Sequence, residues 1–224
     1  MELLSRHKLS DCNKTPRATL FKSGFFVDAI TPTTLSPLAQ TTLTPSYQQL
    51  IGDLTWLSIS TRPDIVAILS LLSEYTHTPS QAHLQYACHV VKYPASTSSL
   101  GLVYSSASHE PSLHSFLQFK DATKGLDVLC DANWGPMDAS KPKPTAPPVE
   151  QSLQSIRSIL GWLALHSGDP IAWGCLRHKN TAQSSCEAEV HYINEATKLV
   201  LQLKLLFRDM NLPLQSTIPL YNNN

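Results

Sequence analysis

The sequence Leu126-Asp127-Val128-Leu129-Cys130 decides the fold class, because the spacing of apolar residues changes here from that of a helix to that of a strand. Apolar residues surround the polar Asp127, and this pattern predicts a strand that ends at Cys130. Two further strands are predicted at 158–166 and 171–176. The residues between them, Ser167-Gly168-Asp169-Pro170, are typical of a hairpin turn.

A long helix is predicted after the third strand, from about Ser185 to Met210, with Asn211 and Pro213 ending it. A final strand is expected to begin at Ile218. Three strands, a long helix and a fourth strand indicate an α/β domain in the second half of the chain.

Helical spacing dominates the residues before these strands. A first helix is predicted from Tyr47, with Ser46 as its N-cap, and a second after Thr61-Arg62-Pro63-Asp64, ending near His77. A third begins at Ser80 and is closed by Pro94. Leu100-Gly101-Leu102-Val103-Tyr104 then predicts a short strand. We therefore expect an extended connector at 1–45, a helical segment at 46–95 and the α/β domain at 96–224, with a proline-rich loop at 135–150.

Composition excludes several classes of protein. Lysine plus arginine, 17 residues, equals aspartate plus glutamate, 17 residues, so the strongly basic balance of a nonspecific nucleic-acid binder is absent. The five cysteines form no CxxC pair, which argues against a disulfide framework and a zinc site. The longest apolar run, Ile65 to Leu72, is too short to span a bilayer. We expect a soluble, intracellular protein, cytoplasmic or nuclear, without a membrane partner and not secreted.

Two carboxylates in Ser184-Ser185-Cys186-Glu187-Ala188-Glu189 have different expected roles. Ser184 and Glu187 have the spacing of a capping box, which explains Glu187 structurally. Glu189 falls on the stripe that we expect to pack on the sheet, formed by Ile193, Ala196, Val200, Leu203 and Phe207. A carboxylate there needs a donor, a proton or a cation. A satisfied or partly exposed first-turn glutamate remains the alternative.

Asp131 stands directly after an apolar strand, where an isolated aspartate is commonly a turn former. Together with Glu189 and a carboxylate on a neighbouring strand, it would instead provide oxygen ligands for two magnesium ions. That arrangement hydrolyses phosphodiesters.

Two groups of residues resemble retrotransposon sequences. Three segments resemble the end of the reverse transcriptase of copia-type elements: Tyr47-Gln48-Gln49-Leu50-Ile51-Gly52-Asp53-Leu54-Thr55-Trp56-Leu57, Thr61-Arg62-Pro63-Asp64-Ile65 and the segment 100–104. Three further segments resemble the ribonuclease H domain of the same elements: Asp131-Ala132-Asn133-Trp134, Pro170-Ile171-Ala172-Trp173 and the segment 184–189. The resemblance implies a Pol polyprotein fragment, with the end of the reverse transcriptase at 46–95. It also implies a C-terminally truncated, ribonuclease-H-like mixed sheet with a long packing helix at 96–224.

The same resemblance assigns site residues one at a time. Asp131 corresponds to the aspartate of the first strand, and Glu189, rather than Glu187, to the helix glutamate. These two would be metal ligands for Mg²⁺ or Mn²⁺, with an RNA/DNA hybrid as substrate and no small-molecule cofactor. The family's third position is an aspartate at a strand end, but Asn223 stands there in this chain. An amide brings no negative charge to hold the cations.

We therefore expect a retrotransposon-derived fragment whose nuclease activity is severely reduced or absent. Two alternatives stay open at this point. One is residual or trans-completed two-metal hydrolysis of RNA in RNA/DNA hybrids. The other is a host-retained module that binds without cutting.

Overall fold

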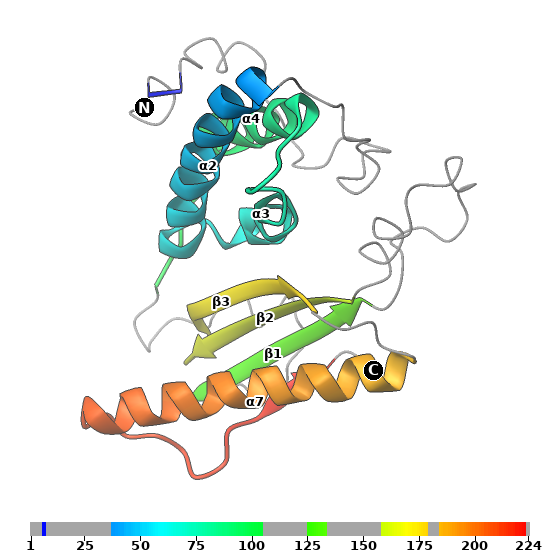
Figure 1. Cartoon of the computed structure of the whole chain (residues 1–224). Helices are drawn as coiled ribbons and strands as arrows, with labels where there is room; N and C mark the ends of the chain where they lie inside the picture. The colour runs from blue at the N-terminus through cyan, green and yellow to red at the C-terminus, as the bar shows by residue number, and fades with distance from the viewer. Residues whose placement is uncertain (1–5, 8–36, 105–124, 134–157, 179–183, 223–224) are drawn as a thin grey trace. The chain divides into compact units, whose positions relative to one another are not determined.

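The computed structural model describes residues 6–7, 37–104, 125–133, 158–178 and 184–222, and it divides the chain into two compact units. Unit 1 comprises Met1–Gly101 and Ser140–Ser155, and unit 2 comprises Leu102–Ala139 and Ile156–Asn224. Most of the expected connector at 1–45 lies outside the described residues, as does the expected proline-rich loop at 135–150. Figure 1 shows the helices of unit 1 and the strands and long helix of unit 2.

Unit 1 is helical. Its elements are α2 (Pro37–Ser60), the 3-10 helix η3 (Pro63–Ile65), α3 (Val66–Ser73) and α4 (Gln81–Ser96). Their apolar faces enclose a core that includes Tyr47, Leu50, Leu54, Ile65, Ile68, Leu72, Ala87 and Val90. The Tyr47 hydroxyl donates a hydrogen bond to the Leu72 carbonyl at 2.8 Å, and burial raises the pKa of this phenol. The three helices are thus joined by one apolar core with a satisfied polar group inside it.

The predicted start of the first helix was wrong. α2 begins at Pro37, so Ser46 lies inside the helix and its hydroxyl donates to the Thr42 carbonyl at 3.1 Å instead of capping an end. Pro45 is also internal. A helical proline removes one backbone donor and disturbs one turn, and packing of the apolar stripe on both sides of it outweighs that local cost here. Leu43 and Tyr47, which flank Pro45, are both buried.

The other helix boundaries were only partly predicted. Ser80 is the N-cap of α4, as expected, and its hydroxyl accepts a hydrogen bond from the His83 amide at 3.3 Å. Pro94 lies inside α4, which ends two residues later at Ser96. α3 ends at Ser73 rather than near His77. Boundaries therefore follow tertiary packing more closely than single proline residues.

The predicted strand at 100–104 is not formed. None of the strand pairs among the described residues includes this segment, and Leu100, Val103 and Tyr104 are each more than half exposed. Strand propensity alone does not create a strand, because a strand needs a partner for its backbone groups and a surface that buries one of its faces.

A buried guanidinium lies between η3 and the end of α4. Arg62 is 5% exposed, and its Nε and Nη2 donate to the Asp64 carboxylate at 2.9 and 2.6 Å. Its Nη1 and Nη2 also donate to the carbonyl and hydroxyl of Thr97 at 3.2 and 2.8 Å. The guanidinium lies 5.3 Å from the ring centroid of Tyr93. Arg62 therefore ties the start of η3 to the end of α4.

The ion pair shifts the pKa of the Arg62 guanidinium upward and that of the Asp64 carboxyl downward. The hydrogen bond to Asp64 raises the pKa of Arg62. Burial acts to raise the pKa of the Asp64 carboxyl, but the hydrogen bonds and positive charge of Arg62 outweigh it and hold that pKa below its ordinary 3.8. Both groups consequently stay charged at neutral pH.

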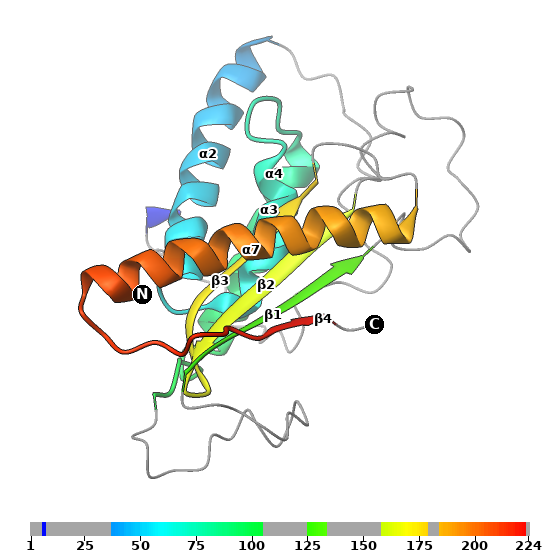
Figure 2. The ribbon, with the colours of Figure 1, turned by 90° about the horizontal axis from the view of Figure 1, so that it is seen from below.

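Unit 2 is a mixed four-stranded sheet, which confirms the α/β class. Its strands are β1 (Leu126–Asn133), β2 (Ile159–His166), β3 (Asp169–Arg177) and β4 (Leu220–Asn222), in the order β3-β2-β1-β4. β2 pairs antiparallel with β1 and β3, whereas β4 pairs parallel with β1. The long helix α7 (Ser185–Asp209) lies across one face of this sheet (Figure 2).

The predicted hairpin between β2 and β3 is confirmed. Ser167 and Gly168 form its tip with φ values of 53° and 88°, and positive φ at both central residues is typical of the tight turns that match strand twist. Pro170 lies within β3, opposite Leu165, where the pairing is irregular. The strand tolerates a proline there because β3 is at the edge of the sheet.

Apolar side chains on one face of the sheet pack against α7. One buried cluster contains Leu126, Val128, Ala164 and Leu203, and a second contains Cys130, Leu160, Tyr192 and Ala196. The predicted helix stripe was right at Ala196, Leu203 and Phe207, which are buried, but wrong at Ile193, which is 41% exposed. Tyr192 occupies the buried position instead.

The connection from α7 to β4 is fixed by one side chain. The Gln215 amide accepts a hydrogen bond from the Leu126 amide at 3.0 Å and donates one to the Leu126 carbonyl at 2.7 Å. It thus takes the place of a strand partner at the start of β1. Gln215 lies where a side chain at position 125 would be, so Gly125 is required for this contact.

No helix among the described residues combines the length and apolar character needed to cross a membrane.

Replacing Asp64 by alanine should destabilise unit 1 by about 3 kcal/mol, because the buried Arg62 guanidinium would lose its charged partner. Urea unfolding followed by helical circular dichroism measures this change. Lys198→Ala is the control, since the Lys198–Glu195 pair on α7 is exposed and its loss should cost less than about 1 kcal/mol. Equal effects of the two substitutions would contradict the assigned role of Arg62.

Candidate functional site

β1 and α7 run in opposite directions, and this brings the start of the helix to the carboxyl end of the strand. Val128 packs in one cluster with Leu203, whereas Cys130, further along the strand, packs with Tyr192, earlier in the helix. We call this end of unit 2 the carboxyl edge, formed by Cys130–Asn133 of β1 and the first turns of α7 at 185–192. Both carboxylates predicted from the sequence belong to it.

Asp131 lies in β1, opposite Gly161 of β2, and is exposed. β1 pairs with β2 without an irregularity, so its side chains alternate between the two faces of the sheet. Cys130 faces α7 in this alternation. Asp131 consequently belongs to the opposite face.

Glu189 lies in the first turns of α7 and is half-buried. It stands three residues before Tyr192, so it continues the stripe that faces the sheet, as the sequence predicted. The structure therefore brings Asp131 and Glu189 to the same edge of the sheet but associates them with opposite faces of β1.

The capping box predicted for Ser184 and Glu187 is formed in part. The Ser184 hydroxyl accepts a hydrogen bond from the Glu187 amide at 3.1 Å, so Ser184 is the N-cap of α7. The Glu187 carboxylate lies 3.7 Å from Nε2 of His191, one turn along the helix. The ring centroids of His191 and His178, which follows β3, are 4.5 Å apart.

The third predicted position, Asn223, lies outside the described residues. The last described residue of β4 is Asn222, which stands opposite Cys130 in the parallel register. Across the described part of the chain, no group of three or more His, Cys, Asp or Glu side chains is arranged to hold a metal ion. The described donors thus do not fit a two-metal site.

Two contacts at the carboxyl edge were not predicted from the sequence. The Tyr192 hydroxyl donates to the carbonyl of Gly161, the residue opposite Asp131, at 3.3 Å. The Cys130 thiol donates to the Tyr221 carbonyl at 3.4 Å, joining β1 to β4. Burial raises the pKa of this thiol, and the neighbouring charge of Asp131 raises it further. The i, i+4 spacing of Tyr192 and Ala196 was the signal available for the first contact.

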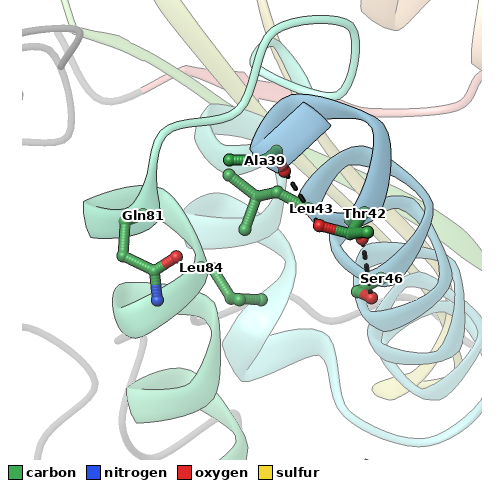
Figure 3. Close-up of a pocket in the computed structure, with 6 residues that line it drawn as sticks. All are labelled: Ala39, Thr42, Leu43, Ser46, Gln81 and Leu84. Carbon is green, nitrogen blue, oxygen red and sulfur yellow. Dashed lines mark hydrogen bonds between the residues drawn. The ribbon is translucent and has the colours of Figure 1, made fainter. Parts of the chain in front are cut away.

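Unit 1 has a shallow pocket of about 320 Å³ between the starts of α2 and α4 (Figure 3). It is lined by Ala39, Thr42, Leu43, Ser46, Gln81 and Leu84. Two hydroxyl groups in it, those of Thr42 and Ser46, are bonded to helix carbonyls at 3.0 and 3.1 Å. Because none of the lining side chains is ionisable, the pocket offers no acid, base or charged metal ligand.

Comparison with known proteins gave several relatives. The chain is 26% identical over 162 residues to the secreted RxLR effector protein 161 of Plasmopara viticola, a match covering 72% of this chain and 94% of the relative. It is 25% identical over 179 residues to the retrovirus-related Pol polyprotein from transposon RE1 of Arabidopsis thaliana, covering 80% of this chain and 10% of the polyprotein. No family model and no solved structure matches the chain.

A third relative is a transposon Ty5-1 protein of Saccharomyces cerevisiae, 30% identical over 174 residues, or 75% of this chain and 46% of the relative. The chain thus spans a tenth to about half of the transposon proteins compared. These similarities support a retrotransposon origin.

Alkylation of native protein should distinguish two cysteines at the carboxyl edge. Cys130 is buried with a raised thiol pKa, whereas Cys186 is exposed. We therefore expect iodoacetamide to label Cys130 at least about tenfold more slowly than Cys186. Peptide mass spectrometry measures both rates. In urea the two rates should become similar. Comparable labelling in the native protein would contradict the packing of Cys130 beneath α7.

Proposed function

We propose that the chain is a fragment derived from a copia-type retrotransposon Pol polyprotein, with the end of a reverse transcriptase in unit 1 and an incomplete ribonuclease-H-like domain in unit 2. The observation that carries this proposal is the mixed sheet β3-β2-β1-β4 crossed by α7, with Asp131 and Glu189 at one edge. A mixed sheet with a long packing helix is what the sequence resemblance implied. The Pol polyprotein relatives support the same origin.

The ancestral activity in this proposal is cleavage of the RNA strand of an RNA/DNA hybrid. Two divalent cations, Mg²⁺ or Mn²⁺, would need carboxylates that converge on them. Asp131 and Glu189 are the only residues that we assign as ligands, and the third position is Asn223, which is uncharged. We therefore infer that the domain lacks nuclease activity.

The geometry of the two remaining carboxylates supports inactivity independently of Asn223. Asp131 shares the β1 face of Asp127 and Leu129, while Glu189 extends from the helix that covers the other face. Two carboxylates alone bring too little negative charge to hold a pair of divalent cations.

The test is an assay on an RNA/DNA hybrid with Mg²⁺ or Mn²⁺. We expect no cleavage by the wild-type chain above the level of Asp131→Ala and Glu189→Ala, because the cation site is incomplete. Glu187→Ala is the matched control for the helix, since Glu187 is assigned no metal. Robust cleavage that persists in Glu187→Ala and disappears in the other two variants would overturn the inactive assignment and establish residual hydrolysis.

A non-catalytic binding module is the second candidate, and one observation favours it. The match to the Plasmopara viticola effector covers 94% of that protein, so a separate chain of similar extent exists in another organism. Fluorescence anisotropy with a labelled RNA/DNA hybrid tests nucleic-acid binding by such a module. Binding that weakens with added salt is the expected result for phosphate contacts, and no binding at low salt would exclude it.

We also propose an intracellular location, cytoplasmic or nuclear. Its support is the scattered cysteine pattern and the relation to transposon Pol polyproteins. The secreted effector among the relatives points in the other direction.

A further inference from the structure

His83 is a buried histidine at the start of α4, where it completes a capping box with Ser80. Its side chain is 2% exposed. Nδ1 of His83 accepts a hydrogen bond from the Ser80 backbone amide at 3.0 Å, and the Ser80 hydroxyl accepts one from the His83 amide at 3.3 Å. A backbone N–H can only donate, so Nδ1 carries no proton and the proton of the ring is on Nε2. The cap therefore requires the neutral form of this imidazole.

Two tyrosine rings from neighbouring segments pack against the imidazole. Tyr75, which lies between α3 and α4, stacks on it with ring centroids 4.0 Å apart. Tyr47 of α2 is tilted toward it, at 6.4 Å between centroids. Phenols are uncharged at neutral and mildly acidic pH, and burial raises the pKa of Tyr47 further. A positive charge on His83 would be removed from water here, and burial disfavours the charged form of histidine.

The other ionisable groups that the structure describes around the cap do not favour this charge. Glu74 and His77, on the chain between α3 and α4, are both exposed, so solvent screens their charges. On α4 itself, Tyr86 and His89 follow the cap and stack on each other, with ring centroids 5.8 Å apart. A proton on His89 would add a like charge to the same helix.

Protonation of Nδ1 would break the cap. It would place one N–H group against another at 3.0 Å, and the Ser80 amide would lose its acceptor. The residue before the cap also joins α4 to α2, because the Gln40 side-chain amide donates to the Pro79 carbonyl at 3.1 Å. Loss of the cap would therefore loosen the first turn of α4 where it is attached to α2.

We propose that His83 is a pH-sensitive switch in unit 1, in which the neutral imidazole holds the start of α4 on α2 and the protonated imidazole releases it. An unfolded chain takes up this proton near the ordinary histidine pKa of about 6.5, whereas the folded unit must lose the Ser80 hydrogen bond to do so. The stability of unit 1 is therefore highest above about pH 6.5 and decreases as the pH falls below that value. The inference concerns unit 1 and is independent of any nuclease activity in unit 2.

Two other charged contacts of unit 1 respond differently to mild acid. Asp64 pairs with Arg62, and its pKa lies below 3.8, so this carboxylate stays charged well below pH 6.5. His7 lies 2.9 Å from Asp53, and protonation of His7 would strengthen that pair. Neither contact can produce a loss of stability in mild acid.

Urea unfolding of the full chain at about pH 7.5 and about pH 5.5 tests the switch, with pulsed hydrogen exchange of α4 peptides, corrected for intrinsic rates, as the readout for unit 1. A histidine that is protonated only in the unfolded state raises the unfolding equilibrium constant about tenfold over this interval. We expect the rise for the wild-type chain to be about tenfold greater than for His83→Gln, because glutamine accepts the Ser80 bond without titrating. Equal pH dependence of the two proteins would overturn the proposal.

A control and a second measurement separate the switch from a general effect of acid. His77→Gln is the matched control, since His77 is exposed and lies before the cap, and it should retain the wild-type pH dependence. Nitrogen NMR of the folded chain tests the cap without unfolding it. We expect a neutral His83 ring protonated on Nε2 at about pH 7.5, and a ring protonated on Nδ1 would contradict the cap and overturn the switch.

Discussion

The alternation of side chains along β1 is the constraint on which unit 2 depends. Leu126, Val128 and Cys130 face α7 and are buried by it. Successive residues of a strand point to opposite faces, so this choice also determines the direction of every residue between them. Asp131 follows Cys130 and must lie on the other face. A shift of one residue would turn Asp131 toward α7, but it would also expose the three apolar side chains that hold the helix on the sheet.

A second constraint, in unit 1, explains a sequence pattern without assigning chemistry to it. Thr61-Arg62-Pro63-Asp64 is one of the segments that resemble reverse transcriptases, and its buried arginine pairs with the partly exposed aspartate and also bonds Thr97. An unpaired guanidinium in this position would be costly, so the partners are needed for folding. Charged residues in a recognisable pattern can therefore be structural, and burial together with satisfied donors is what identifies them as such.

The sequence predicted those elements in which a local pattern agreed with the final packing. β1, the hairpin at Ser167-Gly168 and the N-cap Ser184 follow from alternation, positive φ and capping, all of which are local. The errors concern choices that depend on distant residues. Ser46 was predicted to cap the first helix, but α2 begins at Pro37, and buried side chains on both sides of Pro45 hold this longer helix in place. Tyr192 and Ile193 are both apolar, and only the position of Leu160 and Cys130 on the sheet selects Tyr192 for burial.

The sequence proposed the candidate site as a set of residues, and that assignment stays a prediction; what the structure adds is where two of these residues lie. The buried clusters that join the sheet to α7 contain no carboxylate. Asp131 and Glu189 lie outside these clusters, so their mutual arrangement adds little to the free energy of folding. In the absence of bound cations, converging carboxylates would repel one another, and removing one of them relieves that repulsion. Under the proposed function, Asn223 in place of an aspartate would remove the chemistry without touching the apolar contacts between the sheet and α7.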